Sequence, residues 1–166
     1  MYAASRVLST TSLRVAAFGI VTLVGLIAGA TFAFAGSNAT KQRIAITGKG
    51  DGHTFVLTPL TRKGLQRDSG TFSDCCWSER VILRDGQRIE IENPLATYVG
   101  RRGTLVVRYR VEWANAGNGY TVGTGAWKIV RGTGAYKGLT GNGRSAAAWS
   151  GDQFAGVRAE GWVRRR

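Results

Sequence analysis

The stretch TLVVRYRVEWANAGNGYTVGTGAWKIV, Thr104–Val130, decides the fold because hydrophobic and polar residues alternate along its first half with a period of two. Such alternation is typical of a β-strand with one buried face, whereas a helix would repeat every 3.6 residues. The segment NAGNG at 115–119 has turn composition, so the stretch predicts two long antiparallel strands joined by a turn. On the first strand, the face that we expect to be buried consists of Leu105, Val107, Tyr109, Val111 and Trp113.

The rest of the chain after residue 36 repeats this pattern in shorter pieces. No long stretch has a helical stripe, and the best candidate for a helical turn is GAYKGL at 134–139. Eight or nine antiparallel strands with frequent turns favour a barrel or a sandwich, and we predict an all-β fold, a closed antiparallel barrel of about eight strands. Besides the hairpin at 104–130, we expect a hairpin within 79–92 and strands at 43–48, 53–60, 70–74, 144–150 and 154–163.

The hairpin ERVILRDGQRIEIE at 79–92 offers two registers. A two-residue turn at Asp85-Gly86 would pair Val81 with Glu90 and so mix hydrophobic and charged residues on each face. A three-residue loop with glycine in the left-handed conformation keeps the faces separate, and we predict this loop. It spans Asp85 to Gln87, pairs Leu83 with Ile89 and Val81 with Ile91, and sets Arg80 opposite Glu92.

The first 35 residues have the composition of an export signal. Arg6 and Arg14 precede a run of 21 uncharged residues, 15–35, which ends in AFA. A basic segment, an apolar segment and small residues before a cleavage site are typical of a signal peptide. We therefore predict cleavage after Ala35 and a secreted protein. The alternative is an uncleaved signal anchor, because about 20 apolar residues span a bilayer, and membrane attachment is expected only in that case.

The remaining segment, 36–166, has 131 residues, and we expect it to form a single domain. The whole chain contains 23 Lys and Arg and 10 Asp and Glu, and two of the basic residues precede residue 36, which leaves a net charge of +11. This charge is compatible with polyanion binding or with solubility alone. Apart from RRR at 164–166 the basic residues are scattered, which favours a solvated surface, and no motif indicates a specific nucleic acid.

The segment WKIVRGTGAYKGLTGNG at 127–143 contains five glycines. A phosphate-binding loop is one explanation, but the segment lacks the GK[ST] motif of a P-loop, and no long helix follows it as in a dinucleotide-binding unit. A sharp corner of a barrel fits better, because glycine permits backbone conformations that other residues avoid. We assign this structural turn to Gly132, Thr133, Gly134, Tyr136 and Gly138.

This segment resembles the signature of the allene oxide cyclase and dirigent barrels, in which a strand is followed by a G-[ST]-G-x-[FY] turn and a further glycine. Similar GTGAY stretches occur in secreted actinobacterial proteins. The resemblance is specific over 100–145 and implies an eight-stranded antiparallel barrel with an apolar cavity, often assembled as a homotrimer. It implies no catalytic residues here, because the polar cavity residues of those families have no matching motif positions in this sequence.

Cys75 and Cys76 are the only cysteines of the chain, and they are adjacent. In an exported chain two cysteines usually oxidise, although adjacent Cα atoms, about 3.8 Å apart, are closer than in ordinary disulfides. Three alternatives remain open: a vicinal disulfide that shapes a turn, which we favour, two free or intermolecular thiols, and a redox-active or metal-binding pair. Since His53 is the only histidine, we expect no metal site and no cofactor.

No combination of residues predicts a catalytic mechanism. His53 follows a glycine turn and is expected to end a loop, and a single histidine defines no nucleophile–base pair. The carboxylates offer two candidate pairs, Glu112 with Glu160 and Glu90 with Glu92. Ion pairs across the hairpin to Arg84 and Arg88 explain the second pair without catalysis. We therefore do not favour an enzyme.

Aromatic residues on the long strands are the candidates for ligand binding: Tyr109, Trp113, Trp127 and Trp149. They would face a strand of small residues, Ala155, Val157, Ala159, Gly161 and Val163. Large side chains opposite small ones either fill a barrel or line a cavity. The polar residues Arg108, Arg110, Arg158 and Glu160 are expected outside or at the rim.

Three functions are compatible with these features. The leading hypothesis is a secreted barrel that binds a hydrophobic small molecule without a catalytic set. The second is a cyclase- or dirigent-like enzyme that steers a reactive intermediate by shape. The third is a cationic surface protein that binds acidic polymers through the basic segment VRRR at 163–166, with a steep dependence on salt.

Overall fold

The computed structural model describes residues 40–76 and 78–166, so the expected signal segment, 1–35, lies outside the described residues. Within the described part, no helix is long and apolar enough to cross a bilayer. Two short 3-10 turns, η1 (Asp51–His53) and η2 (Gly134–Tyr136), accompany ten strands. The strands are β1 (Gln42–Lys49), β2 (Thr54–Pro59), β3 (Asp68–Cys75), β4 (Glu79–Arg84), β5 (Gln87–Glu92), β6 (Leu95–Gly100), β7 (Gly103–Gly117), β8 (Tyr120–Gly132), β9 (Leu139–Ser150) and β10 (Gln153–Arg165).

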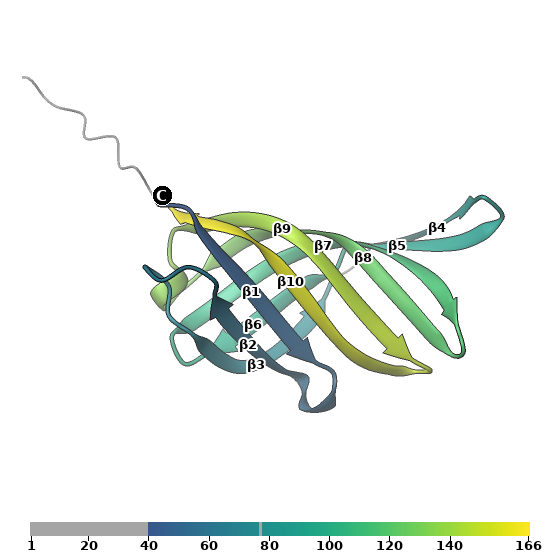
Figure 1. The fold of residues 1–166 in the computed structure, drawn as a ribbon, viewed down its shortest axis with the longest axis horizontal. Helices are drawn as coiled ribbons and strands as arrows, with labels where there is room; N and C mark the ends of the chain where they lie inside the picture. Colours follow the sequence, from purple (N-terminus) through teal and green to yellow (C-terminus); the bar gives the residue numbers. More distant parts are fainter. Residues whose placement is uncertain (1–39, 77) are drawn as a thin grey trace, which may run out of the picture. The chain divides into compact units, whose positions relative to one another are not determined.

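Eight of these strands form a closed antiparallel barrel in the order β1–β2–β3–β6–β7–β8–β9–β10, with β10 paired to β1 (Figure 1). The predicted all-β barrel and the helical turn at η2 are thereby confirmed. β6 was not predicted from the sequence, because the hydrophobic alternation between Pro94 and Gly100 is carried by only Ala96 and Tyr98 on the inner face. A pattern this short falls below what periodicity can distinguish from a loop.

The β4–β5 hairpin lies outside the barrel and extends from β7, where Ile91 pairs with Glu112 (Figure 1). Its turn has two residues, Asp85 and Gly86, with φ of 52° and 77°. Positive φ at both positions is the conformation of a type I′ turn, which an Asp-Gly pair favours.

The predicted three-residue loop of this hairpin is therefore wrong. Val81 pairs with Glu90, and Glu79 rather than Arg80 lies opposite Glu92. The prediction assumed that one face of the hairpin is buried. Ile89 and Ile91 of β5 are 7% and 2% exposed, but Val81 and Leu83 of β4 are 45% and 78% exposed. The buried side of the hairpin therefore does not include Val81 and Leu83, and the chemistry of the turn sets the register.

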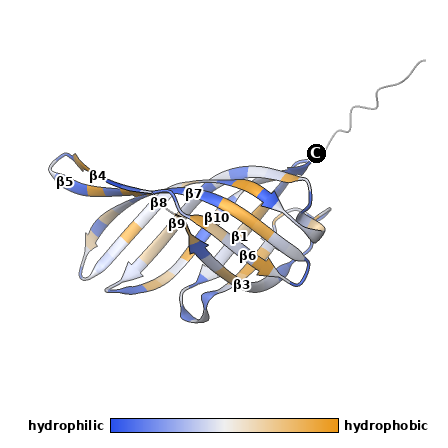
Figure 2. Cartoon of the chain, turned by 180° about the vertical axis from the view of Figure 1, so that it is seen from behind, coloured by the Kyte–Doolittle hydropathy of each residue, from blue (hydrophilic) through white to orange (hydrophobic). Residues whose placement is uncertain are grey.

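The hydrophobic core occupies the inside of the barrel. Figure 2, a view from behind, shows hydrophobic and hydrophilic residues alternating along the strands. On β7 the predicted inner face is confirmed, because Leu105, Val107, Tyr109 and Val111 are at most 5% exposed and Trp113 is half-buried. Residues from every barrel strand contribute to the core, which includes Ile44, Ile46, Phe55, Leu57, Phe72, Tyr98, Trp127, Leu139, Ala159 and Val163.

Trp127 fills the barrel at the level of its cross-strand partner Tyr109. A Cβ added to Gly161 would lie 2.7 Å from the Trp127 ring, so the indole fits only because a glycine lies beneath it. The expected small face of β10 is confirmed at Val157, Ala159 and Val163, which lie half-buried or buried.

Ala155 does not belong to this small face. A β-bulge between Phe154 and Gly156 shifts the register of β10 against β9. It leaves Ala155 exposed and turns the half-buried ring of Phe154 against the core. One extra residue in a bulge exchanges the two faces of a strand, and a strict period of two cannot show it.

The closed end of the barrel is the end formed by η2, the β6–β7 turn and the C-terminal end of β10. Asp68, which is 4% exposed, lies at its centre. Its carboxylate accepts hydrogen bonds from the Tyr136 hydroxyl at 2.7 Å and from the backbone N–H groups of Ser69, Arg101 and Arg102 at 2.8–3.1 Å. Tyr136 is 1% exposed and plugs this end of the core.

Gly134 shows why the turn that follows β8 needs glycine. Its φ is +55°, and a Cβ at this position would overlap the carbonyl oxygen of Arg102 in the β6–β7 turn. The close approach also brings the Ala135 N–H within 2.8 Å of that same oxygen. The five residues assigned from sequence to a structural turn thus lie at the corner where β8 leaves the barrel wall and β9 begins.

Candidate functional site

A cavity of about 130 Å³ lies at the open end of the barrel, opposite η2. The open end is formed by η1, the β7–β8 turn and the β9–β10 turn. Side chains from most of the barrel strands converge there. Six of those that line the cavity are aromatic: Phe72, Tyr98, Tyr109, Trp113, Trp149 and Phe154.

The aromatic rings form a connected wall. The ring centroids of Trp149 lie 5.3 Å from Phe154 and 6.5 Å from Trp113, and Phe72 lies 5.7 Å from Tyr98. These spacings are in the range at which edge-to-face and tilted ring pairs attract one another. Trp149 is 37% exposed, so this wall reaches from the core to solvent.

The inner side of the cavity carries a pair of buried hydroxyls. The oxygens of Tyr98 and Tyr109 are 2.7 Å apart and share one hydrogen bond. Burial raises the pKa of Tyr98 to about 12 and that of Tyr109 well above its usual range. Both phenols are therefore neutral at physiological pH, and together they can offer one hydroxyl proton or lone pair to a molecule in the cavity.

Two carboxylates and the lone histidine line the mouth of the cavity. Trp113 donates from its indole Nε1 to Glu92 at 2.9 Å, and this bond orients the indole ring. Asp74, the inward residue near the end of β3, is exposed. The ring of His53 lies 5.7 Å from that of Phe72 and covers part of the wall.

The field at the mouth is negative. Burial raises the pKa of Glu92; the hydrogen bond from Trp113 opposes this effect, and the charges of Glu90 and Asp74 add to it. Glu79 and Glu90 of the hairpin each bring a carboxylate oxygen within 4.8 Å of one on Glu92. Negative charge thus continues from the cavity to the base of the hairpin.

Three of the four aromatic residues predicted for ligand binding lie together at this cavity: Tyr109, Trp113 and Trp149. Trp127 does not join them. It is 2% exposed and donates from its Nε1 to the Glu160 carbonyl oxygen at 3.1 Å. Trp127 therefore fills the barrel, which is the other role that the sequence allows for these four aromatic residues.

Cys75 and Cys76 form a vicinal disulfide at the end of β3, with Cα atoms 3.7 Å apart. Cys76 has φ of +59°, so the pair occupies a tight turn immediately after Asp74. Of the three alternatives, the vicinal disulfide was the favoured one. The bond lies at the open end of the barrel, where β3 ends.

The remaining polar candidates lie outside the barrel. Arg110 and Arg158 are exposed, and Glu160 pairs with Arg43 at 2.9 Å. Arg88 pairs with Glu90 at 3.3 Å, but along β5 and not across the hairpin as expected. Arg84 does not pair with Glu90, because the two-residue turn places it on the other face of the hairpin, where it pairs with Glu112 at 3.0 Å.

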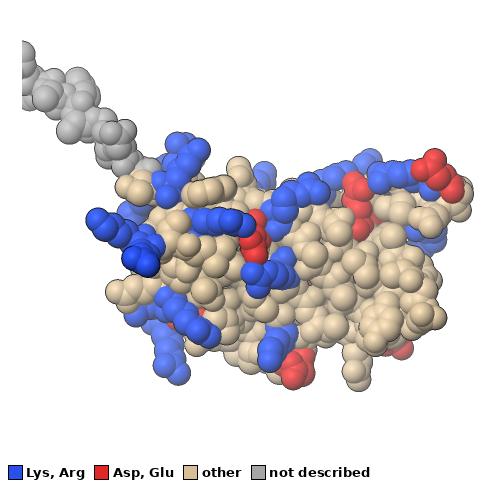
Figure 3. Space-filling model, viewed as in Figure 1, with Lys and Arg blue, Asp and Glu red and all other residues tan. Residues whose placement is uncertain are grey.

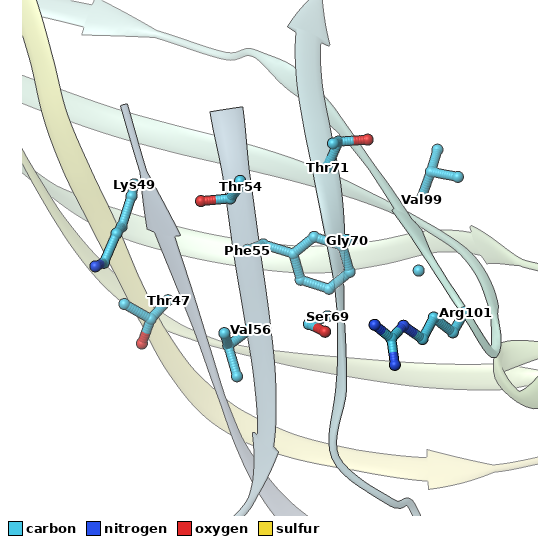
Figure 4. Close-up of a pocket in the computed structure, with 11 residues that line it drawn as sticks. Thr47, Lys49, Thr54, Phe55, Val56, Ser69, Gly70, Thr71, Val99 and Arg101 are labelled. Carbon is cyan, nitrogen blue, oxygen red and sulfur yellow. The ribbon is translucent and has the colours of Figure 1, made fainter. Parts of the chain in front are cut away.

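A second and larger hollow, of about 640 Å³, lies on the outer wall over β1, β2, β3 and β6. Figure 4 shows Thr47, Val56 and Ser69 on neighbouring strands, with Lys49 and Arg101 at its margins. This hollow is open to solvent and has hydroxyl and aliphatic groups where the cavity has aromatic rings. An open depression of this kind buries little of a small ligand, so we regard the aromatic cavity as the candidate site.

Charge is divided between the two ends of the barrel. In Figure 3, Lys and Arg side chains gather at the end that holds the C-terminus. The basic residues of the closed end are Lys41, Arg62, Lys63, Arg67, Arg101, Arg102, Arg131, Lys137, Arg164, Arg165 and Arg166. Within 40–76 and 78–166, Asp68 is the acidic residue of that end. The open end and its hairpin carry seven acidic residues, Asp51, Asp74, Asp85, Asp152, Glu79, Glu90 and Glu92, against four basic ones, Lys49, Arg80, Arg84 and Arg88.

No protein-family model, curated protein or solved structure matches this chain. Four residues of the cavity were not predicted from the sequence: Phe72, Phe154, Asp74 and Glu92. The alternation of β3 placed Phe72 on the face of Asp74, which was a usable signal. No sequence signal placed Glu92, because its position depends on the hairpin register, and none placed Phe154, because it depends on the bulge.

Proposed function

We propose that this protein is an exported barrel that binds a small, largely hydrophobic molecule in the aromatic cavity of its open end. The observation that supports the proposal best is the convergence of Trp113, Trp149 and Phe154 around a cavity of about 130 Å³ that reaches solvent. Large apolar side chains seldom remain half-exposed around a hollow without a role in recognition. The vicinal disulfide supports export, because disulfides persist in oxidising compartments.

The dimensions of the cavity limit the ligand. A cavity of about 150 Å³ in another protein, lined by aliphatic and aromatic side chains, binds benzene. A ligand of about six to eight non-hydrogen atoms therefore fits here. At the efficiency typical of very small ligands, Kd is expected between about 1 µM and about 1 mM.

The test is isothermal titration calorimetry of the purified protein with benzyl alcohol, p-cresol and 3,3-dimethylbutan-1-ol. Two tryptophan variants provide a matched comparison. Trp149→Ala removes a wall of the cavity, whereas Trp162→Ala removes an indole that is 51% exposed on the outer face of β10. We expect saturable binding of at least one compound, weakened about tenfold or more by Trp149→Ala and unchanged by Trp162→Ala.

Equal effects of the two tryptophan variants would show that binding is nonspecific and would contradict the proposal. Absence of saturable binding both by these three compounds and by organic cations of the same size would also contradict it. Chemical conversion of a bound compound would favour the cyclase- or dirigent-like alternative over a simple binder.

A second function is favoured by the basic closed end, namely adhesion to acidic polymers. Of the terminal arginines, Arg165 is committed to the fold, because it donates to the carbonyl oxygens of Ala135 and Lys137 at 2.8 and 3.1 Å. Arg164 and Arg166 are exposed. Binding to polyphosphate should fall steeply with salt and should weaken in the double variant Arg164→Gln, Arg166→Gln but not in the double variant Arg80→Gln, Arg88→Gln of the hairpin.

A further inference from the structure

The charges that line the cavity are of one sign. Asp74 and Glu92 both line it, and among the residues that the structure describes no Lys or Arg does so. This contrast is specific to the site, because the segment 36–166 as a whole is strongly basic. A cavity that selected neutral hydrophobic molecules would not need two carboxylates, since each loses hydration when a ligand covers it.

The aromatic wall, like the two carboxylates, favours a positively charged ligand. The faces of Trp, Tyr and Phe rings carry negative potential and attract cations within about 6 Å. Trp113 and Trp149 are inclined to each other by 67° at 6.5 Å, so the two indoles form two sides of a corner. Phe154 adds a third ring at 5.3 Å from Trp149.

We propose that the ligand of this cavity is a small alkylammonium cation, held by the rings of Trp113, Trp149 and Phe154 and by the carboxylates of Asp74 and Glu92. This inference rests on the proposed function and names the chemical class of its ligand. A metal cation fits less well, because hard cations require several oxygen ligands to replace their water and the cavity wall is mostly aromatic carbon. An ammonium ion that carries alkyl groups holds its water weakly and presents apolar surface to the rings.

Two further carboxylates, at the base of the β4–β5 hairpin, contribute to the same preference from a distance, and Arg88 offsets part of the charge of Glu90. Glu79 and Glu90 extend the negative charge of Glu92 away from the mouth. Such a field raises the local concentration of cations and disfavours anions. The basic closed end, at the other end of the barrel, would have the opposite effect on ligands that approach it.

The test compares two molecules that differ in a single atom. Choline and 3,3-dimethylbutan-1-ol have the same shape, but choline has a positively charged nitrogen where the alcohol has a carbon. Calorimetric titration of the protein at low salt should give a Kd for choline at least about tenfold lower than that for the alcohol. Glu92→Gln, whose amide oxygen can still accept the Trp113 hydrogen bond, should weaken choline binding about fivefold and leave the alcohol within about twofold.

Asp74→Asn should act in the same direction as Glu92→Gln. Asp152→Asn is the matched control, because it removes a negative charge from the exposed β9–β10 turn of the same end but not from the cavity lining. We expect its effect on the ratio of the two Kd values to be less than about twofold.

The outcomes distinguish the inference from the proposed function. Equal or tighter binding of the alcohol would overturn the alkylammonium assignment and leave the proposed function standing. A preference for choline that Asp152→Asn removes as strongly as Glu92→Gln would also overturn it, because the general field rather than the cavity would then be responsible. If choline does not bind but benzyl alcohol or p-cresol does, only the inference fails; if none of these compounds binds, both fail.

Discussion

The two ends of the barrel use the same kinds of residue in opposite ways. At the closed end the hydroxyl of Tyr136 and the carboxylate of Asp68 bind to each other, and the aromatic ring is buried. At the open end Trp149 and Asp74 are exposed around a cavity. Polar groups that satisfy one another stabilise a fold, whereas those that face a solvent-accessible hollow remain free to bind something else. We therefore assign stability to the closed end and recognition to the open end.

The largest effect on stability is expected from Tyr136→Ala at the closed end. The substitution leaves a cavity in the core and removes one hydrogen bond from Asp68, so the free energy of unfolding should fall by about 3–5 kcal/mol. Urea denaturation, monitored by tryptophan fluorescence, measures this free energy. Trp149→Ala at the open end removes a larger but partly exposed side chain and should lower this free energy by less than about 2 kcal/mol. A larger loss of stability in Trp149→Ala than in Tyr136→Ala would contradict the assignment of stability to the closed end.

Asp68→Asn is expected to have the next largest effect, about 2–3 kcal/mol, because an amide cannot accept all four hydrogen bonds of the carboxylate. It should also change the response to acid. Burial raises the pKa of Asp68, but the hydrogen bonds from Tyr136 and three backbone N–H groups outweigh it and hold the pKa below the ordinary 3.8.

A carboxyl group whose pKa is lowered by folding stabilises the native state above its unfolded pKa and loses this contribution as pH falls. The wild-type protein should therefore lose stability below about pH 4, and the difference from Asp68→Asn should shrink there. Thermal unfolding of both proteins between pH 2 and pH 7 measures this difference. A constant difference across the range would show that the charge of Asp68 does not matter.

The smallest effect is expected from reduction of the Cys75–Cys76 disulfide. A bond between adjacent residues closes no loop of the unfolded chain, so the free energy of unfolding should change by less than about 1 kcal/mol. Its location beside Asp74 predicts that reduction changes ligand affinity more than stability. Titration calorimetry and denaturation before and after treatment with a reductant measure the two quantities, and a large loss of stability with unchanged affinity would contradict this prediction.

The sequence could predict the barrel because its long strands are regular. The alternation from Leu105 to Trp113 is unbroken on the inner face, and the glycine-rich corner around Gly134 is marked by composition alone. Short or irregular elements gave weaker signals. Only Ala96 and Tyr98 mark the inner face of β6, and the bulge at Phe154 is one inserted residue in an otherwise alternating strand.

The candidate site was predictable only in part, for a related reason. Tyr109, Trp113 and Trp149 were identified because each is an aromatic residue on a long strand. The same rule selected Trp127, since strand position alone does not tell whether a ring fills the barrel or lines its mouth. That distinction depends on the glycine at 161 lying beneath Trp127, which is a contact between strands remote in sequence.

The most direct test of the account is an NMR titration that follows the indole N–H signals of the tryptophans as choline is added. Trp113 donates its indole proton to Glu92 at the mouth, and Trp127 donates its own to Glu160 within the wall. We expect the signals of Trp113 and Trp149 to shift together and to saturate, while those of Trp127 and Trp162 stay in place. A saturating shift of Trp162 without Trp113 and Trp149 would contradict the assignment of recognition to the open end, and absence of any shift would contradict the alkylammonium inference.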